Sequence, residues 1–113
     1  MKKSCLNDWL TALRSNKYKM CRGALRKEDS YCALGVLCDI SGLDTWKPDP
    51  YSKKFEYLGE VNYLPKKVRE WAKLSEEEFD IMSAFVMVLN DNEKVGLSKM
   101  ADLLEEKYKA KKK

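Results

Sequence analysis

The segment that most constrains the fold of this chain is residues 31–41, YCALGVLCDIS, which predict a helix with apolar side chains on every side. Such a helix is buried at the centre of a domain, because none of its faces suits water. Asp29 or Ser30 is expected to cap its start, and Gly42 to end it. Gly35 costs roughly 1 kcal/mol of helix propensity relative to alanine, so we expect it to allow close contact with another segment.

Two further helices are predicted to pack one face against this centre. The first covers residues 4–15, with Ser4 as its expected N-cap. Its apolar face follows the i, i+3, i+4, i+7 spacing of a helix and consists of Leu6, Trp9, Leu10 and Leu13. A final amphipathic helix follows Gly96, with an inward face of Leu97, Met100, Ala101, Leu104 and Tyr108.

The clearest local signal in the sequence is a helix start at residue 75. Ser75 and Glu78 have the spacing of a capping box, in which each side chain bonds a backbone N–H of the other residue. The helix that follows, over residues 76–89, is broadly apolar, and we expect it to be the second central helix. A shorter helix is predicted just before it, over residues 65–73.

Two stretches favour extended backbone. Residues 18–25 and the approach to Tyr31 predict a hairpin that turns around residues 27–29. Residues 55–64 are the best strand candidate, with a turn at Gly59. Together these elements predict an α+β fold, mostly helical, with about five helices around a small antiparallel β-sheet or hairpin.

The 113-residue chain is long enough for one domain and too short for two. We expect a single compact domain over residues 1–106 and a basic, disordered tail over residues 107–113, KYKAKKK. The sequence opens with no apolar signal segment. No stretch approaches the ~20 apolar residues that a membrane-spanning helix needs. We therefore expect a cytoplasmic protein.

Composition excludes several kinds of chemistry. The sequence has no histidine, so the Ser–His–Asp and Cys–His catalytic arrangements cannot be built. The glycine-rich loops that bind phosphates in many nucleotide-binding proteins are also absent. Residues 90–93, NDNE, are predicted to form a turn and lack the spacing of a calcium loop. The four cysteines lack the paired spacing of zinc ligands, so we predict no metal and no cofactor and expect packed thiols.

Charge is unevenly distributed along the sequence, whose net charge is +4. Residues 9–27 carry six basic and no acidic side chains, residues 107–113 carry five lysines, and the part between them is acidic. A basic surface over residues 14–27, together with the tail, could bind nucleic acid or an acidic protein. The same basic residues could instead pair with the acidic body. Asp39 is expected to pair with an arginine, because an acid near a helix C-terminus opposes the helix dipole.

The start of the apolar helix is the candidate binding site. Free backbone N–H groups at a helix N-terminus favour a phosphate or carboxylate, and Arg22 and Arg26 precede this start in the sequence. Tyr31 offers a stacking surface. Cys32 lies in the first predicted turn, where thiol pKa values fall, so it is also the candidate nucleophile; a packed thiol is the alternative. The full set of candidate binding residues is Arg22, Arg26, Tyr31, Cys32, Asn90 and Asp91, with the last two at the rim.

Three stretches resemble small uncharacterised proteins encoded by bacteriophages and prophages. They are LRSNKYKMCRGALRKEDSYCALGVLCDISGL, YLPKKVREWAKLS, and LND followed by GLSKMADLLEE. The resemblance covers residues 9–106, and its core is an aromatic-Cys-x-Leu-Gly-Val-Leu-Cys-Asp pattern with a later Leu-Asn-Asp. It implies a phage-borne accessory protein acting in the cytoplasm of a bacterial host. Small proteins of this kind often counter host defence by sequestering a nucleotide signal or blocking a host protein.

Three functions are compatible with these observations. The leading one is a phage-encoded, non-enzymatic binding protein, a host-defence inhibitor that binds an anionic or nucleotide ligand or a host protein. The alternative is a nucleic-acid-associated protein that uses residues 14–27 and the C-terminal tail. The third is a Cys-dependent enzyme. No membrane partner is expected, and self-association into a homo-oligomer is left open.

Overall fold

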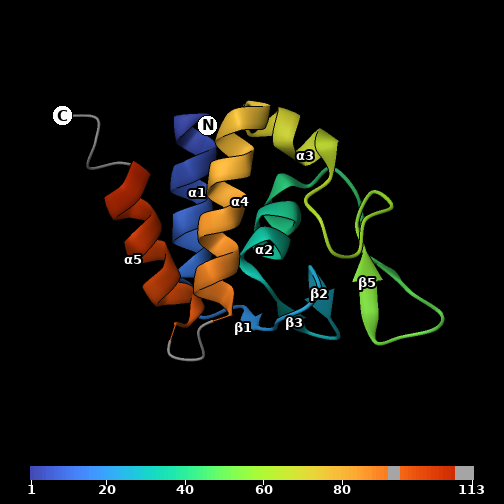
Figure 1. Ribbon diagram of the computed structural model, residues 1–113. Coiled ribbons are helices and arrows are strands. Elements are labelled where there is room, and N and C mark those ends of the chain that lie inside the picture. The colour runs from blue at the N-terminus through green and yellow to red at the C-terminus, as the bar shows by residue number, and fades with distance from the viewer. Residues whose placement is uncertain (92–94, 109–113) are drawn as a thin grey trace.

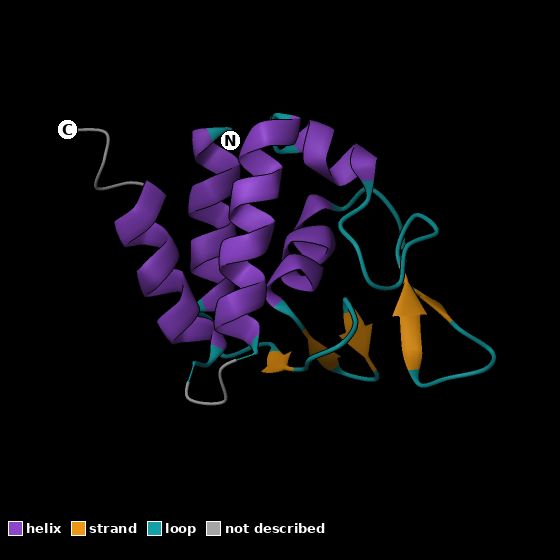
Figure 2. Ribbon diagram, viewed as in Figure 1, coloured by secondary structure: helices purple, strands orange, loops and turns teal. Residues whose placement is uncertain are grey.

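The computed structural model describes residues 1–91 and 95–108. Its helices are α1 (Lys3–Leu13), α2 (Ala33–Ser41), α3 (Lys66–Trp71), α4 (Glu76–Asn90) and α5 (Leu97–Tyr108). Its strands are β1 (Lys19–Met20), β2 (Arg26–Lys27), β3 (Ser30–Tyr31), β4 (Lys47–Pro48) and β5 (Lys54–Glu56). The helices gather at one end of the molecule and the short strands at the other (Figures 1 and 2). The predicted α+β, mostly helical fold with five helices is confirmed for the described residues.

Helix α2 lies at the centre of the core, as its all-round apolar sequence predicts. Residues 33–38 are all buried, and α2 packs against α1, α3 and α4. The indole Nε1 of Trp9 donates a hydrogen bond to the carbonyl oxygen of Ala33 at 2.9 Å, which ties α1 to the first turn of α2. Gly42 ends the helix with a left-handed backbone conformation (φ 65°), as predicted.

The start of α2 differs from the prediction. Neither Asp29 nor Ser30 caps the helix, because the chain from Ser30 to Tyr31 is strand β3. The N-cap is Cys32, whose sulfur accepts a hydrogen bond from the backbone N–H of Gly35. The sequence did not indicate this role, since Ser, Thr, Asp and Asn are the usual N-cap residues.

Gly35 provides the close contact that the sequence predicted. A Cβ atom at this position would lie 1.9 Å from the carbonyl oxygen of Leu25. The first turn of α2 therefore rests directly on the backbone that leads into β2.

Helix α1 buries its predicted face: Leu6, Trp9, Leu10 and Leu13 are all within the core. Ser4 is not the N-cap, however, because the helix already begins at Lys3. The N-cap residue is Lys2, which makes no side-chain capping bond.

The sheet has the strand order β1-β3-β2-β5-β4. A hairpin does turn within residues 27–29: β2 and β3 pair in antiparallel register, with Lys27 opposite Ser30. Its first strand is β2, however, and of the predicted extended stretch 18–25 only β1 is a strand. Strand β1 pairs with β3 in parallel, so the sheet is mixed and not wholly antiparallel. The predicted strand over residues 55–64 is much shorter, because β5 ends at Glu56. The chain then turns through Leu58 and Gly59, which both have positive φ.

Helix α4 begins with the predicted capping box of Ser75 and Glu78. The expectation that it is a second central helix is wrong. Only Met82 and Val86 of α4 are buried, whereas Ile81 and Val88 are 52% and 71% exposed. A single helix pattern could not tell which apolar side faces the core, because the other elements decide that.

Helix α5 buries Leu97, Met100, Ala101 and Leu104, and it packs against α1. It continues through Tyr108, so the first two residues of the predicted tail are helical. The rest of that tail, residues 109–113, lies outside the described residues.

Candidate functional site

The six candidate residues separate into two groups in the fold. Cys32, Asn90 and Asp91 line a cavity between α2 and α4, and Arg22 lies next to it. Arg26 and Tyr31 lie side by side on the sheet, away from this cavity. The predicted single site around the start of α2 is therefore two separate places.

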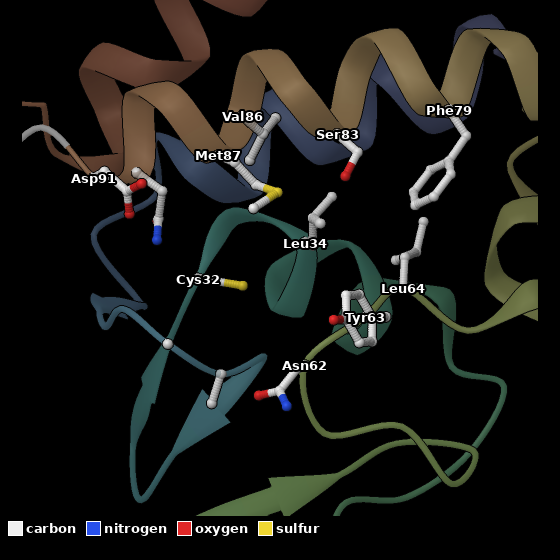
Figure 3. A pocket seen from close by; sticks show the side chains of 13 residues that line it. Cys32, Leu34, Asn62, Tyr63, Leu64, Phe79, Ser83, Val86, Met87 and Asp91 are labelled. Carbon is white, nitrogen blue, oxygen red and sulfur yellow. The ribbon is translucent and has the colours of Figure 1, made fainter.

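The α2–α4 cavity has a volume of about 310 Å³ and is lined mainly by apolar side chains. In Figure 3, Ser83, Val86 and Met87 point from α4 toward α2, and Tyr63 and Leu64 come from the segment after the sheet. The larger apolar side chains of the lining are Leu34, Tyr63, Leu64, Phe79, Val86 and Met87. Tyr63 and Met87 are 71% and 57% exposed, so the cavity opens to solvent between two large side chains.

Polar groups lie among the apolar ones: Asn62, Ser83, Cys32, Asn90 and Asp91. The side-chain oxygen of Asn90 is buried and has no hydrogen-bond partner among the described residues. Such an unpaired buried acceptor typically costs about 1–3 kcal/mol of stability. The described lining contains neither lysine nor arginine.

Arg22 supports the end of α4. Its Nε donates a hydrogen bond to the backbone carbonyl of Asn90, the last residue of that helix. The last carbonyls of a helix lack partners within the helix and carry partial negative charge, so a guanidinium group is favourable there. Arg22 therefore holds Asn90 and Asp91 beside the cavity, and its Nε hydrogen bond goes to the end of α4 and not to the start of α2, where the sequence prediction placed this arginine.

Cys32 is a capping residue with a protonated thiol. Burial raises the thiol pKa to about 11, against the smaller opposing effect of the Gly35 N–H. The direction is opposite to the one expected from a helix N-terminus with arginines nearby. At neutral pH the sulfur is therefore neutral and a poor nucleophile. The Cys32 N–H donates to the Leu25 carbonyl, so this helix end has less to offer an anion.

Arg26 lies over aromatic rings on one face of the sheet. Its guanidinium carbon is 4.2 Å from the ring centre of Phe55 and 5.0 Å from that of Tyr31. The strand register explains this arrangement, because Arg26 lies opposite Tyr31 on one side and Phe55 on the other. Cation–π contacts of this kind stabilise the sheet. Arg26 is therefore a packing residue in this structure.

Asp39 does not pair with an arginine, so that prediction is wrong. Its carboxylate accepts hydrogen bonds from the Tyr18 hydroxyl at 2.6 Å and from the Trp46 indole N–H at 2.9 Å. Burial and the neighbouring Asp39 raise the pKa of Tyr18 well above its ordinary value. The physical reason is proximity: the residues just before β1 and β4 bring two neutral donors to the end of α2.

The basic residues of the 14–27 segment take different partners. Arg14 pairs with Asp102 and Glu105 of α5 at 2.8 and 2.9 Å. Lys19 pairs with Asp29 at 3.2 Å. These ion pairs agree with the alternative in which the basic segment pairs with the acidic part of the chain.

Sequence reasoning missed most of the cavity. It did not include residues 62–64 or the α4 side chains Phe79, Ser83 and Met87. One signal was available: residues 76–89 are apolar on more sides than a core-facing helix requires. The additional apolar residues could have indicated that α4 also lines a cavity or a binding surface.

Residues 1–91 and 95–108 contain no grouping of three or more Cys, Asp or Glu side chains that could hold a metal ion. None of the described helices is both long enough and apolar enough to cross a membrane.

Fold and site together define a small α+β protein with a ligand-sized cavity beside its central helix. The chain belongs to the family described as "Domain of unknown function (DUF8296)", which matches residues 1–112. Comparison with curated proteins and with solved structures found no significant match to this chain.

Proposed function

We propose that this protein is a small, non-enzymatic binding protein whose α2–α4 cavity holds a small molecule. The observation that carries the proposal is the cavity itself, which is lined mainly by apolar side chains with polar ones among them. Its volume of about 310 Å³ is at the lower end of the range for small-molecule sites, roughly 300–1,000 Å³. A compact ligand with an apolar body and one polar edge fits this chemistry.

The sequence resemblance supports the same location. Its two signature stretches, residues 31–39 and 89–91, are far apart in the chain and both contribute to the cavity lining. We propose, on this resemblance, a phage accessory protein in the bacterial host cytoplasm. In that role it would inhibit host defence by sequestering a nucleotide-derived signal. The neutral thiol of Cys32 favours this binding role over a Cys-dependent enzyme.

Ligand binding can be tested by titrating ¹⁵N-labelled protein with nucleosides, nucleotides and small aromatic compounds in two-dimensional NMR. Binding should shift the amide signals of the cavity residues. Ser83→Trp should fill the cavity and abolish those shifts, because Ser83 lines it. Ala84→Trp is the matched control, since Ala84 is the next residue and is exposed. If no compound binds, or if Ser83→Trp binds as the parent does, the cavity is not the site.

A second candidate function is blocking a host protein through the outer side of α4. Ile81 and Val88 are largely exposed and lie on the same side of the helix. The helix has four acidic and no basic residues, so we expect a partner with lysines or arginines around an apolar patch. A partner captured by the parent and by Leu43→Glu, but lost with Val88→Glu, would support this. Retention by Val88→Glu would contradict it.

The nucleic-acid alternative predicts DNA or RNA affinity that falls steeply with salt, because phosphate contacts release counterions. Affinity should also weaken when residues 107–113 are removed. Absent or salt-insensitive binding would eliminate this alternative.

A further inference from the structure

The sheet end of the molecule is basic, whereas the helical end is acidic. Residues 17–31 and 46–57, which contain all the strands, carry eight basic and four acidic side chains. The other described residues carry nine basic and thirteen acidic side chains. Figure 2 shows the strands and the helices at different ends of the molecule, so the two charges are separated in space. Such a charge distribution attracts a polyanion toward the sheet.

Two lysines of the sheet lie directly opposite each other. Lys27 of β2 is in register with Lys54 of β5. Neither forms an ion pair with a described acidic residue, since the ion pairs of this region use Lys19 and Lys53 instead. Like charges at directly opposite positions destabilise a sheet, because their Cβ atoms are only about 5 Å apart. A phosphate group between the two ammonium groups would replace this repulsion with attraction.

The loop between β4 and β5 presents an aromatic ring close to these lysines. Tyr51 in this loop is 94% exposed, and Lys54 follows it three residues later at the start of β5. Figure 1 shows the loop projecting from the sheet on the side of the molecule away from α5. The faces of the Tyr51 ring are therefore accessible to a flat partner such as a nucleic-acid base.

Hydrogen bonds within the loop fix its conformation. The Asp49 carboxylate accepts the Tyr51 N–H at 3.3 Å and the Ser52 hydroxyl at 2.8 Å. The hydroxyl oxygen of Ser52 accepts the Lys54 N–H at 3.1 Å. Pro50 restricts the backbone between Asp49 and Tyr51, because its ring fixes φ. The ring of Tyr51 is thus presented on an ordered turn, which reduces the entropy that binding must cost.

From these observations we propose that the β4–β5 loop and the lysines beside it bind single-stranded nucleic acid. A base stacks on the exposed ring of Tyr51, and a neighbouring phosphate lies between Lys27 and Lys54. Aromatic rings beside cations suit a single strand, because its base faces are free to stack. The site is independent of the α2–α4 cavity, whose lining contains none of these three residues. It also differs from the nucleic-acid alternative above, because it does not require residues 107–113.

Fluorescence anisotropy with a labelled oligo(dT) tests the stacking contact. Tyr51→Leu should lower the affinity at least about fivefold, which corresponds to about 1 kcal/mol, the lower end of the range for one stacked base. Tyr51→Phe keeps the ring and should bind as the parent does. Neither substitution disturbs the core, because Tyr51 is 94% exposed. Absence of oligo(dT) binding, or equal affinities for the parent and Tyr51→Leu, would overturn the proposal.

The salt dependence of the same affinity tests the lysines. Lys54→Gln should reduce the slope of log affinity against log salt concentration by about 0.7, the value for one phosphate contact of a single strand. Lys27→Gln should do the same. Lys99→Gln is the matched control, because Lys99 is exposed on α5 and should leave the slope unchanged. Unchanged slopes for both Lys54→Gln and Lys27→Gln would refute the phosphate contact.

Competition with polyglutamate distinguishes a nucleic acid from an acidic protein segment. Polyglutamate offers carboxylates to the lysines but has no ring to stack on Tyr51. At matched charge it should displace labelled oligo(dT) at least about fivefold less effectively than unlabelled oligo(dT) does. Equal competition would mean that the surface recognises acidic chains in general, and the proposal would then be wrong.

Discussion

Replacing Gly35 with alanine tests the contact on which the centre of the fold depends. The added Cβ would lie 1.9 Å from the carbonyl oxygen and 2.8 Å from the carbonyl carbon of Leu25. Cβ atoms in proteins essentially never approach heavy atoms within 3.0 Å, so α2 and Leu25 must separate by more than about 1 Å. Leu25 cannot move freely, because its N–H donates to Val61 and its carbonyl accepts from Cys32.

The expected loss of stability follows from these contacts. Overpacking of this kind costs about 1–3 kcal/mol, and weakening the Cys32–Leu25 hydrogen bond adds about 1 kcal/mol. Alanine recovers about 1 kcal/mol of helix propensity. The net loss should be about 1–3 kcal/mol, a sizeable part of the 5–15 kcal/mol typical of a whole domain.

Urea denaturation followed by circular dichroism measures this loss. Gly35→Ala should lower the denaturation midpoint, with the slope unchanged. Gly96→Ser is the control, because a Cβ at Gly96 meets no atom within 4 Å and serine suits the residue before α5. Ordinary surface substitutions change the free energy of unfolding by up to about 0.5 kcal/mol. If the value for Gly35→Ala lies that close to the parent's, the contact between Gly35 and Leu25 does not limit the size of the residue at position 35.

Four further predictions concern individual side chains. Cys32 should react slowly with iodoacetamide at pH 7, and the rate should rise toward pH 11, because burial raises its pKa to about 11; half-maximal reactivity near pH 7 would contradict this. A raised folded-state pKa gives stability that is fully present below the ordinary thiol value of 9.0 and is lost as pH rises toward 11. The free energy of unfolding, measured by urea denaturation, should therefore fall by roughly 2 kcal/mol between pH 9 and 11, and by less in Cys32→Ser. A free energy of unfolding that stays constant over this range would refute the linkage. Asp39→Ala should lower the free energy of unfolding by about 2–3 kcal/mol, because the hydroxyl of Tyr18 and an indole N–H lose a charged acceptor. An unchanged unfolding transition in calorimetry would show that those two hydrogen bonds do not stabilise the fold. Arg14→Ala should lower the free energy of unfolding by at most about 1 kcal/mol, and by less in 1 M salt, because its ion pairs are partly exposed. Lys17→Ala is the control and should leave the free energy of unfolding unchanged. A loss that does not depend on salt would indicate a packing effect instead.

The parts of the fold that were predicted correctly depend on short-range sequence patterns. The apolar face of α1 and the capping box of Ser75 and Glu78 are set by residues three or four apart. The burial of α2 followed from a sequence with no polar side. Each of these features is decided within one or two helical turns, so a single sequence suffices.

The parts that failed depend on contacts between distant segments. Asp39 takes its donors from Tyr18 and Trp46, which no local pattern connects with it. The outer side of α4 resembles its inner side in composition, so only the neighbouring elements decide that Val88 is exposed. The cavity also needs residues 62–64, which reach α4 only because β5 ends early and the chain turns at Gly59.

The packing of α1 against α5 has a consequence during synthesis. These are the first and last helices of the described chain, and Arg14 binds α5 through Asp102 and Glu105. More than eighty residues separate the end of α1 from the start of α5. At typical translation rates of about 5–20 residues per second, α1 waits on the order of ten seconds for this partner. Throughout that interval the side of α1 that later packs against α5 is exposed on the nascent chain, and chaperones near the ribosome can bind it.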